Sequence, residues 1–107
     1  MLNATAMSAI LSDVLLGSTL FVSYEAGRPA SEKAVDDASR AKSEGLSMLH
    51  HVGTFVSLKT SKKGDLVLTV WSETRGEKGA YRAFNPNLGN LRSLHVIEHA
   101  ADLGAGI

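Results

Sequence analysis

The sequence predicts a mainly β domain with two helices, in which five short antiparallel strands form a curled sheet or a small barrel. Three observations support this fold class. Apolar and polar residues alternate with a period of two over five segments, most clearly on either side of the turn within residues 50–73. Glycine-bearing turns bound the central segments, and helical spacing occurs in two other segments, residues 3–16 and 31–44.

Length and composition favour one domain over residues 1–107. The chain has 107 residues, 44% of them hydrophobic, which is enough for a single core. Cysteine is absent, which excludes disulfides and thiol chemistry and favours a reducing compartment, so we expect a cytoplasmic protein. The apolar start has no preceding Lys or Arg and is interrupted by Asp13, so we expect neither a signal peptide nor a membrane anchor.

The first predicted element is an amphipathic helix within residues 1–17. Asn3 or Thr5 can cap its start and Gly17 can end it. Its apolar residues recur at i, i+3, i+4 and i+7. We expect this face to pack on the core of its own chain, with a contact to a second subunit as the alternative; the residues concerned are Met7, Ile10, Leu11 and Val14.

A strand over residues 18–26 comes next, followed by a helical insertion over residues 31–44. Ser31 can cap this second helix and Gly45 can end it. Its apolar side is small and its charges are spaced for helical pairs, so we expect it on the surface of the sheet.

The central hairpin covers residues 50–73, with a turn at 61–64 in which Gly64 supplies left-handed backbone geometry. Alternation predicts that its core-facing residues are Val52, Val56, Leu66, Leu68 and Val70. Trp71 shares a face with Val67 and Thr69. We expect Trp71 to be buried beneath a helix, the alternative being an exposed ligand platform.

The remaining elements are a strand over residues 80–85, one turn of 3₁₀ helix in the segment 85–90, a strand over 91–99 and a tail over 100–107. In the first of these strands, Tyr81 and Ala83 share one face, and Arg82 and Phe84 the other. The layout of residues 18–99 resembles the SH3-like small barrel, although the helical insertion departs from its simplest form. A flat sheet with helices on one face is the alternative.

Candidate catalytic and metal-binding groups are scattered along the chain. His50 and His51 are adjacent and point to opposite faces of a strand, and His95 and His99 would lie about 13 Å apart on one strand. No Gly-x-Ser-x-Gly motif or phosphate-binding loop occurs. We therefore predict no metal site, no cofactor and no catalytic residues. A small enzyme of unknown reaction is kept as a second alternative to the two binding functions described next.

The charge distribution leads to the main functional hypothesis. The chain carries 11 basic and 11 acidic residues, but residues 50–92 hold seven basic and three acidic ones, a local excess of +4. These basic residues could form one edge that binds nucleic acid, with Tyr81 stacking on unpaired bases. The predicted edge comprises Lys59, Lys62, Lys63, Arg75, Lys78, Arg82 and Arg92. The alternative is a protein-interaction or self-assembly module, because an apolar helix and open sheet edges suit peptide binding or dimerisation.

Overall fold

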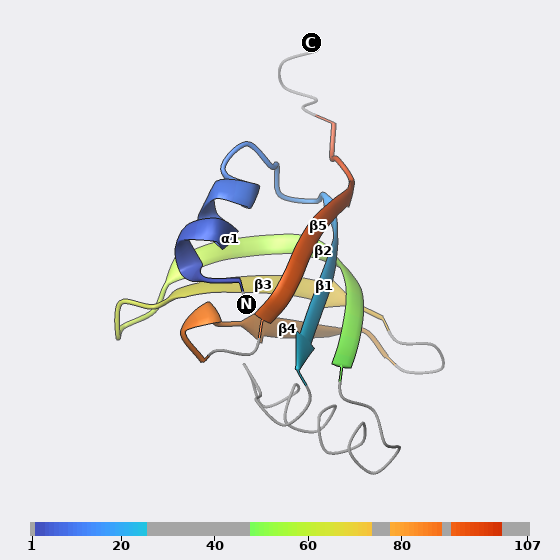
Figure 1. Ribbon diagram of the computed structural model, residues 1–107. Coiled ribbons are helices and arrows are strands. Elements are labelled where there is room, and N and C mark those ends of the chain that lie inside the picture. Colours follow the sequence, from blue (N-terminus) through green and yellow to red (C-terminus); the bar gives the residue numbers. More distant parts are fainter. Residues whose placement is uncertain (1, 26–47, 74–77, 89–90, 102–107) are drawn as a thin grey trace.

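The computed structural model describes residues 2–25, 48–73, 78–88 and 91–101 (Figure 1). Its elements are α1 (Ala4–Leu11), β1 (Thr19–Glu25), β2 (Met48–Thr60), β3 (Leu66–Ser72), β4 (Ala80–Phe84), the 3₁₀ helix η1 (Pro86–Leu88) and β5 (Leu91–Glu98). The predicted mainly β fold with five antiparallel strands is confirmed. The predicted helix at 31–44 and the tail beyond residue 101 lie outside the described residues.

The five strands form one antiparallel sheet in the order β4-β3-β2-β1-β5. β4 and β5 are its two edges, so the described residues form an open curled sheet and not a closed barrel. The long strand β2 joins two halves of this sheet. Residues Met48–Thr54 pair with β1 and residues Thr54–Thr60 pair with β3, so that Thr54 is shared by both registers. In Figure 1, β1 and β5 run across the direction of β3 and β4, and β2 bends from one direction to the other.

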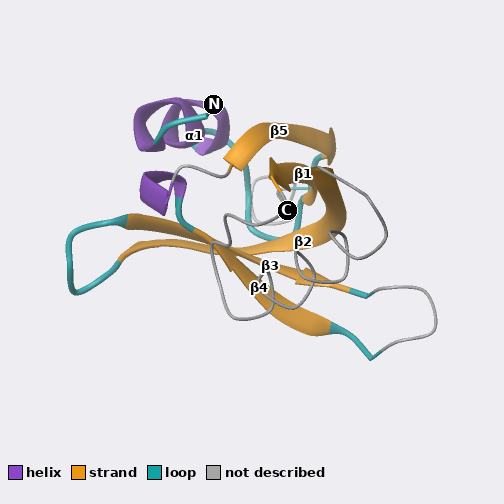
Figure 2. Ribbon diagram, turned by 60° about the horizontal axis from the view of Figure 1, so that its bottom comes forward, coloured by secondary structure: helices purple, strands orange, loops and turns teal. Residues whose placement is uncertain are grey.

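The inner face of the curl holds the hydrophobic core. α1 lies beside β5 and η1 at the open side of the curl, as Figure 2 shows. Met7 and Leu11 of α1 are buried together with residues from all five strands. The strand residues of the core are Leu20, Val22, Tyr24, Phe55, Leu68, Val70, Phe84, Leu91 and Leu94.

α1 is shorter than the predicted helix. Of the two predicted caps, Asn3 and Thr5, the structure uses Asn3, whose side-chain oxygen accepts a hydrogen bond from the Ala6 amide at 2.8 Å. It ends at Leu11, and Gly17 (φ +93°) lies in the turn before β1 and not at the helix end. Met7 and Leu11 have 0% and 4% of their surface exposed, so both side chains belong to the core, as expected for packing within one chain.

The prediction that Val52 faces the core is wrong. Leu20 and Val22 are buried, and their partners on β2 are Gly53 and His51, which therefore share the inner face. Val52 lies on the outer face and is 51% exposed. A register shift lies at Val56, because Phe55 pairs with Val70 but Ser57 pairs with Thr69. Odd-numbered residues of β2 face inward before this shift and even-numbered ones after it. A single alternation therefore could not predict the inward face of the whole strand.

β3 and the turn before it agree with the sequence. Leu68 and Val70 are fully buried, as predicted. Gly64 has φ +88° in the turn that connects β2 and β3. Phe84 and Arg82 lie on the buried side of β4, whereas Tyr81 is 64% exposed, which confirms the predicted division of faces.

Candidate functional site

The basic residues of the predicted edge that the structure describes do not gather in one place. Lys59, Lys62 and Lys63 are exposed at the β2–β3 turn. Lys78 is exposed just before β4, at the opposite end of the β3–β4 hairpin from that turn (Figure 1). Arg75 lies outside the described residues. The lysines at the β2–β3 turn, which we call the lysine tip (Lys59, Lys62 and Lys63), are thus separated from Lys78 by the length of β3.

The two remaining arginines are engaged within the chain. Arg82 is opposite the buried Val70, is 3% exposed, and donates hydrogen bonds from Nη1 to the Ser72 carbonyl at 3.3 Å and to the Ser72 hydroxyl. Burial removes Arg82 from the predicted nucleic-acid edge. The Nη1 of Arg92 lies 3.3 Å from a carboxylate oxygen of Glu25, so its charge is balanced locally.

A carboxylate also lies beside the lysine tip. The two oxygens of Asp65 accept hydrogen bonds from Asn85 Nδ2 at 3.0 Å and from Asn87 Nδ2 at 2.6 Å. These bonds, together with the charge of Lys63, lower the pKa of Asp65 below its ordinary value of 3.8. The tip therefore presents a negative charge next to its positive ones.

The outer face of the β5-β1-β2 half carries a cluster of rings and aliphatic side chains. Phe21 stacks on His50, with ring centroids 5.3 Å apart, and lies 6.3 Å from the His95 ring. Val52 and His95 are the cross-strand partners of Phe21 on its two sides. Val52 is 51% and Ile97 56% exposed. We call this surface the ring patch, and its members are Phe21, His50, Val52, His95 and Ile97.

A second aromatic group lies on the β3-β4 half. Trp71 and Tyr81 are cross-strand partners, with ring centroids 4.8 Å apart and ring planes at 68°. Trp71 is only partly buried, and α1 packs against the opposite, inner face. α1 therefore does not cover Trp71, and the other predicted helix, at 31–44, lies outside the described residues.

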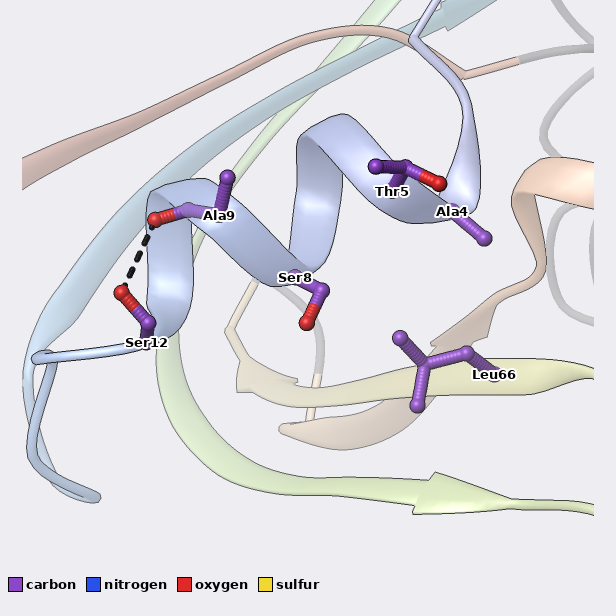
Figure 3. A pocket seen from close by; sticks show the side chains of 6 residues that line it. All are labelled: Ala4, Thr5, Ser8, Ala9, Ser12 and Leu66. Atoms are coloured by element: carbon purple, nitrogen blue, oxygen red, sulfur yellow. Dashed lines mark hydrogen bonds between the residues drawn. The ribbon is translucent and has the colours of Figure 1, made fainter.

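A groove of about 490 Å³ lies between α1 and the start of β3 (Figure 3). Its lining consists of small and hydroxyl-bearing residues of α1 and its C-cap residue Ser12 on one side, and Leu66 on the other. The Ser12 hydroxyl donates to the Ala9 carbonyl at 3.1 Å. No charged side chain lines the groove, so it lacks a group that would orient a polar ligand; the lining residues are Ala4, Thr5, Ser8, Ala9, Ser12 and Leu66.

Polar pairs near the core link neighbouring strands. The Ser23 and Ser93 hydroxyls hydrogen-bond between β1 and β5, and the Tyr24 hydroxyl lies 3.0 Å from His51 Nε2 between β1 and β2. Neither pair joins a serine to an imidazole, the arrangement that activates a serine nucleophile. Within the described ranges no three His, Asp or Glu side chains gather closely enough to hold a metal ion.

Sequence reasoning found the lysine tip but missed the ring patch. Alternation within a single strand does not say which face of a sheet is covered, so it could not show that Phe21 and Val52 share the outer face. The exposure of both aromatic groups follows from the tertiary structure, in which α1 covers the inner face.

Comparison of the chain with protein-family models, curated protein sequences and solved structures found no match. In the part of the chain that the structure describes, no helix is long and apolar enough to cross a membrane.

Proposed function

We propose that this chain is a non-catalytic interaction module that self-associates through the ring patch. The observation that carries the proposal is the exposure of Val52 in the middle of the sheet, with Phe21 beside it. An antiparallel sheet with one solvated face normally alternates apolar and polar residues. Phe21 on β1 and Val52 on β2 depart from this pattern, because they are cross-strand partners that place two adjacent apolar side chains on the outer face.

The chemistry of the patch favours a protein partner over a polyanion. Nucleic-acid affinity depends on Lys and Arg side chains that contact phosphates. The ring patch itself contains no such side chain, and nearby Arg92 is paired with Glu25. Aromatic residues with few lysines are characteristic of the buried centre of protein interfaces.

A second copy of the chain is the partner that suits this surface. The formal net charge is zero, so two copies do not repel each other through their total charge. A twofold axis would place the patch against itself, and sheets commonly stack face to face about 10 Å apart. Phe21 and Val52 would then be covered by the same residues of the second copy.

Sedimentation velocity over a range from low micromolar to millimolar protein tests the proposal. We expect the wild type to self-associate and Val52→Glu to remain monomeric, because the substitution places an unpaired carboxylate in the apolar contact. Leu88→Glu is the matched control, since Leu88 is 50% exposed on η1, outside the patch, and we expect it to self-associate like the wild type. Circular dichroism verifies that both variants are folded.

Two results would overturn self-association through this patch. One is a wild type that is monomeric at every concentration. The other is equal association by folded Val52→Glu and Leu88→Glu variants.

Nucleic-acid binding is the competing proposal, and it is supported by the three exposed cations of the lysine tip. In this case a fluorescent single-stranded oligonucleotide would bind at low salt, and binding would fall as salt rises. We expect the double variant Lys62→Glu/Lys63→Glu to lose this binding and Val52→Glu to keep it. Binding that is insensitive to salt, or no binding, would contradict it.

The relationship of this sheet to a known barrel architecture is a separate proposal. We propose that the open curled sheet is a variant of the SH3-like small barrel. The order of the strands along the chain, the bend of β2 and the 3₁₀ turn before β5 support this relationship.

A further inference from the structure

Trp71 and Tyr81 form an aromatic corner on the outer face of the β3-β4 half. Their ring planes meet at 68° with centroids 4.8 Å apart, the edge-to-face geometry that aromatic pairs prefer. Tyr81 is 64% exposed and Trp71 partly exposed, so both rings have surface available to solvent. Two exposed ring planes at a wide angle provide two walls for a ligand.

Gly79 and Glu73 position the indole of Trp71. A Cβ atom at Gly79 would lie 2.3 Å from Cζ2 of Trp71, so the indole lies directly against the glycine backbone. The same point is 2.9 Å from Cγ of Glu73, which places the Glu73 side chain beside the indole. Glu73 is exposed, and its carboxylate is therefore a negative charge next to the aromatic corner.

This combination has the chemistry of a cation site. The faces of Trp and Tyr rings attract cations through the ring quadrupole, and a neighbouring carboxylate adds a charge-assisted hydrogen bond. We propose that the corner formed by Trp71, Tyr81 and Glu73 binds an arginine side chain of a partner protein. The planar guanidinium can stack on a ring and donate to Glu73 at the same time, which a lysine ammonium does less well.

Lys78 is the neighbouring positive charge that such a ligand must tolerate. It precedes Gly79 and is exposed, so its ammonium is free to extend into water. Among the residues that the structure describes, the charged groups at the corner are the Glu73 carboxylate and the Lys78 ammonium, and the aromatic faces supply the preference for an organic cation. The corner belongs to the β3-β4 half of the sheet, and the inference is independent of self-association through the ring patch.

Fluorescence offers a direct measurement, because Trp71 is the single tryptophan of the chain. The full chain is titrated with a capped Gly-Arg-Gly peptide and with the matching citrulline peptide, which has nearly the same shape but no charge. We expect a saturable change in Trp71 emission with the arginine peptide, with a Kd in the millimolar range, and no saturable change with citrulline.

Three variants locate the site. We expect Glu73→Gln to raise the Kd of the arginine peptide severalfold and Tyr81→Ala to abolish saturable binding. Glu98→Gln is the matched control, since Glu98 is an exposed carboxylate on β5, away from the corner, and we expect an unchanged Kd. Circular dichroism establishes that Tyr81→Ala is folded.

Several outcomes would overturn the proposal. They are an equal response to arginine and citrulline peptides, a Kd that Glu73→Gln leaves unchanged, and tighter binding of a lysine peptide. A saturable response to adenosine monophosphate without one to the arginine peptide would replace the cation by a stacked base.

Discussion

Asp65 shows how a single residue links parts of the chain that are distant in sequence. It lies at the end of the β2–β3 turn, where its amide hydrogen-bonds to the Ser61 hydroxyl at 3.2 Å. Its carboxylate accepts from Asn85 and Asn87, which lie between β4 and the end of η1. The sequence placed Asp65 directly after the predicted turn at 61–64, and Asn85 and Asn87 in the predicted turn at 85–90, but only the pairing of β3 with β4 brings these segments together.

The pKa of Asp65 provides a test of this contact. The Asn85 hydrogen bond has the largest lowering effect, followed by the Asn87 hydrogen bond and then the charge of Lys63. We therefore expect the Asp65 pKa to rise most in Asn85→Ala, less in Asn87→Ala and least in Lys63→Ala. Carboxyl ¹³C chemical shifts followed through a pH titration measure each value. Lys59→Ala is the control, and a pKa that Asn85→Ala leaves unchanged would contradict the assignment.

The same shift determines how Asp65 affects stability. Its folded-state pKa lies below the ordinary value of 3.8, so the ionised form stabilises the fold at pH values above that value. This contribution is lost as the pH falls through the folded-state pKa. The effect is therefore confined to acid conditions, and the variants of Asn85 and Asn87 should have reduced pH dependence of unfolding there.

Among the elements, α1 illustrates how burial separates two interpretations of one apolar stripe. The four residues at helical spacing predicted packing on the core, with a subunit contact as the alternative. In the structure Met7 and Leu11 are buried in the core, Val14 packs partly against it and Ile10 is 36% exposed. One side of the apolar stripe therefore faces the core, and the other side faces solvent.

Alanine substitutions distinguish the two sides of α1. We expect Met7→Ala to lower the free energy of unfolding by about 2–5 kcal/mol, because it leaves a cavity in the core. Ile10→Ala, on the same helix, should cost less than about 1 kcal/mol. Urea unfolding at two protein concentrations measures both values. Equal losses, or a Met7→Ala loss that disappears on dilution, would indicate an intermolecular role.

β2 marks the limit of reasoning from a strand's alternation. Its first half places Gly53 inward, where a Cβ would come within 2.8 Å of the Trp71 carbonyl oxygen, so glycine allows this close approach to β3. After the register shift at Val56, Leu58 pairs with the buried Leu68. A period-two pattern predicted a strand correctly over both halves, but its phase is set by the bulge, which depends on the partner strands.

At the scale of the whole molecule, the bend of β2 creates two outer surfaces that face differently. The ring patch belongs to the β5-β1-β2 half, and the aromatic corner to the β3-β4 half. The lysine tip and Lys78 lie at opposite ends of β3, which explains why a local excess of +4 in the sequence does not become a basic surface in the described structure. The two binding proposals can therefore be tested separately, with Val52→Glu for one and Glu73→Gln for the other.

Residue patterns alone predicted the mainly β class, the positions of the strands, a helix cap at Asn3 or Thr5, the left-handed Gly64 and the two faces of β4. These features depend on side-chain periodicity and on local backbone preferences, and both are specified by residues that are close together in the sequence. Three further properties could be seen only in the three-dimensional fold: the sheet is open, Val52 and Trp71 have solvent access, and Arg82 is buried. Those properties depend on which face α1 covers and on where β2 bends, and both are set by contacts between segments far apart in the chain.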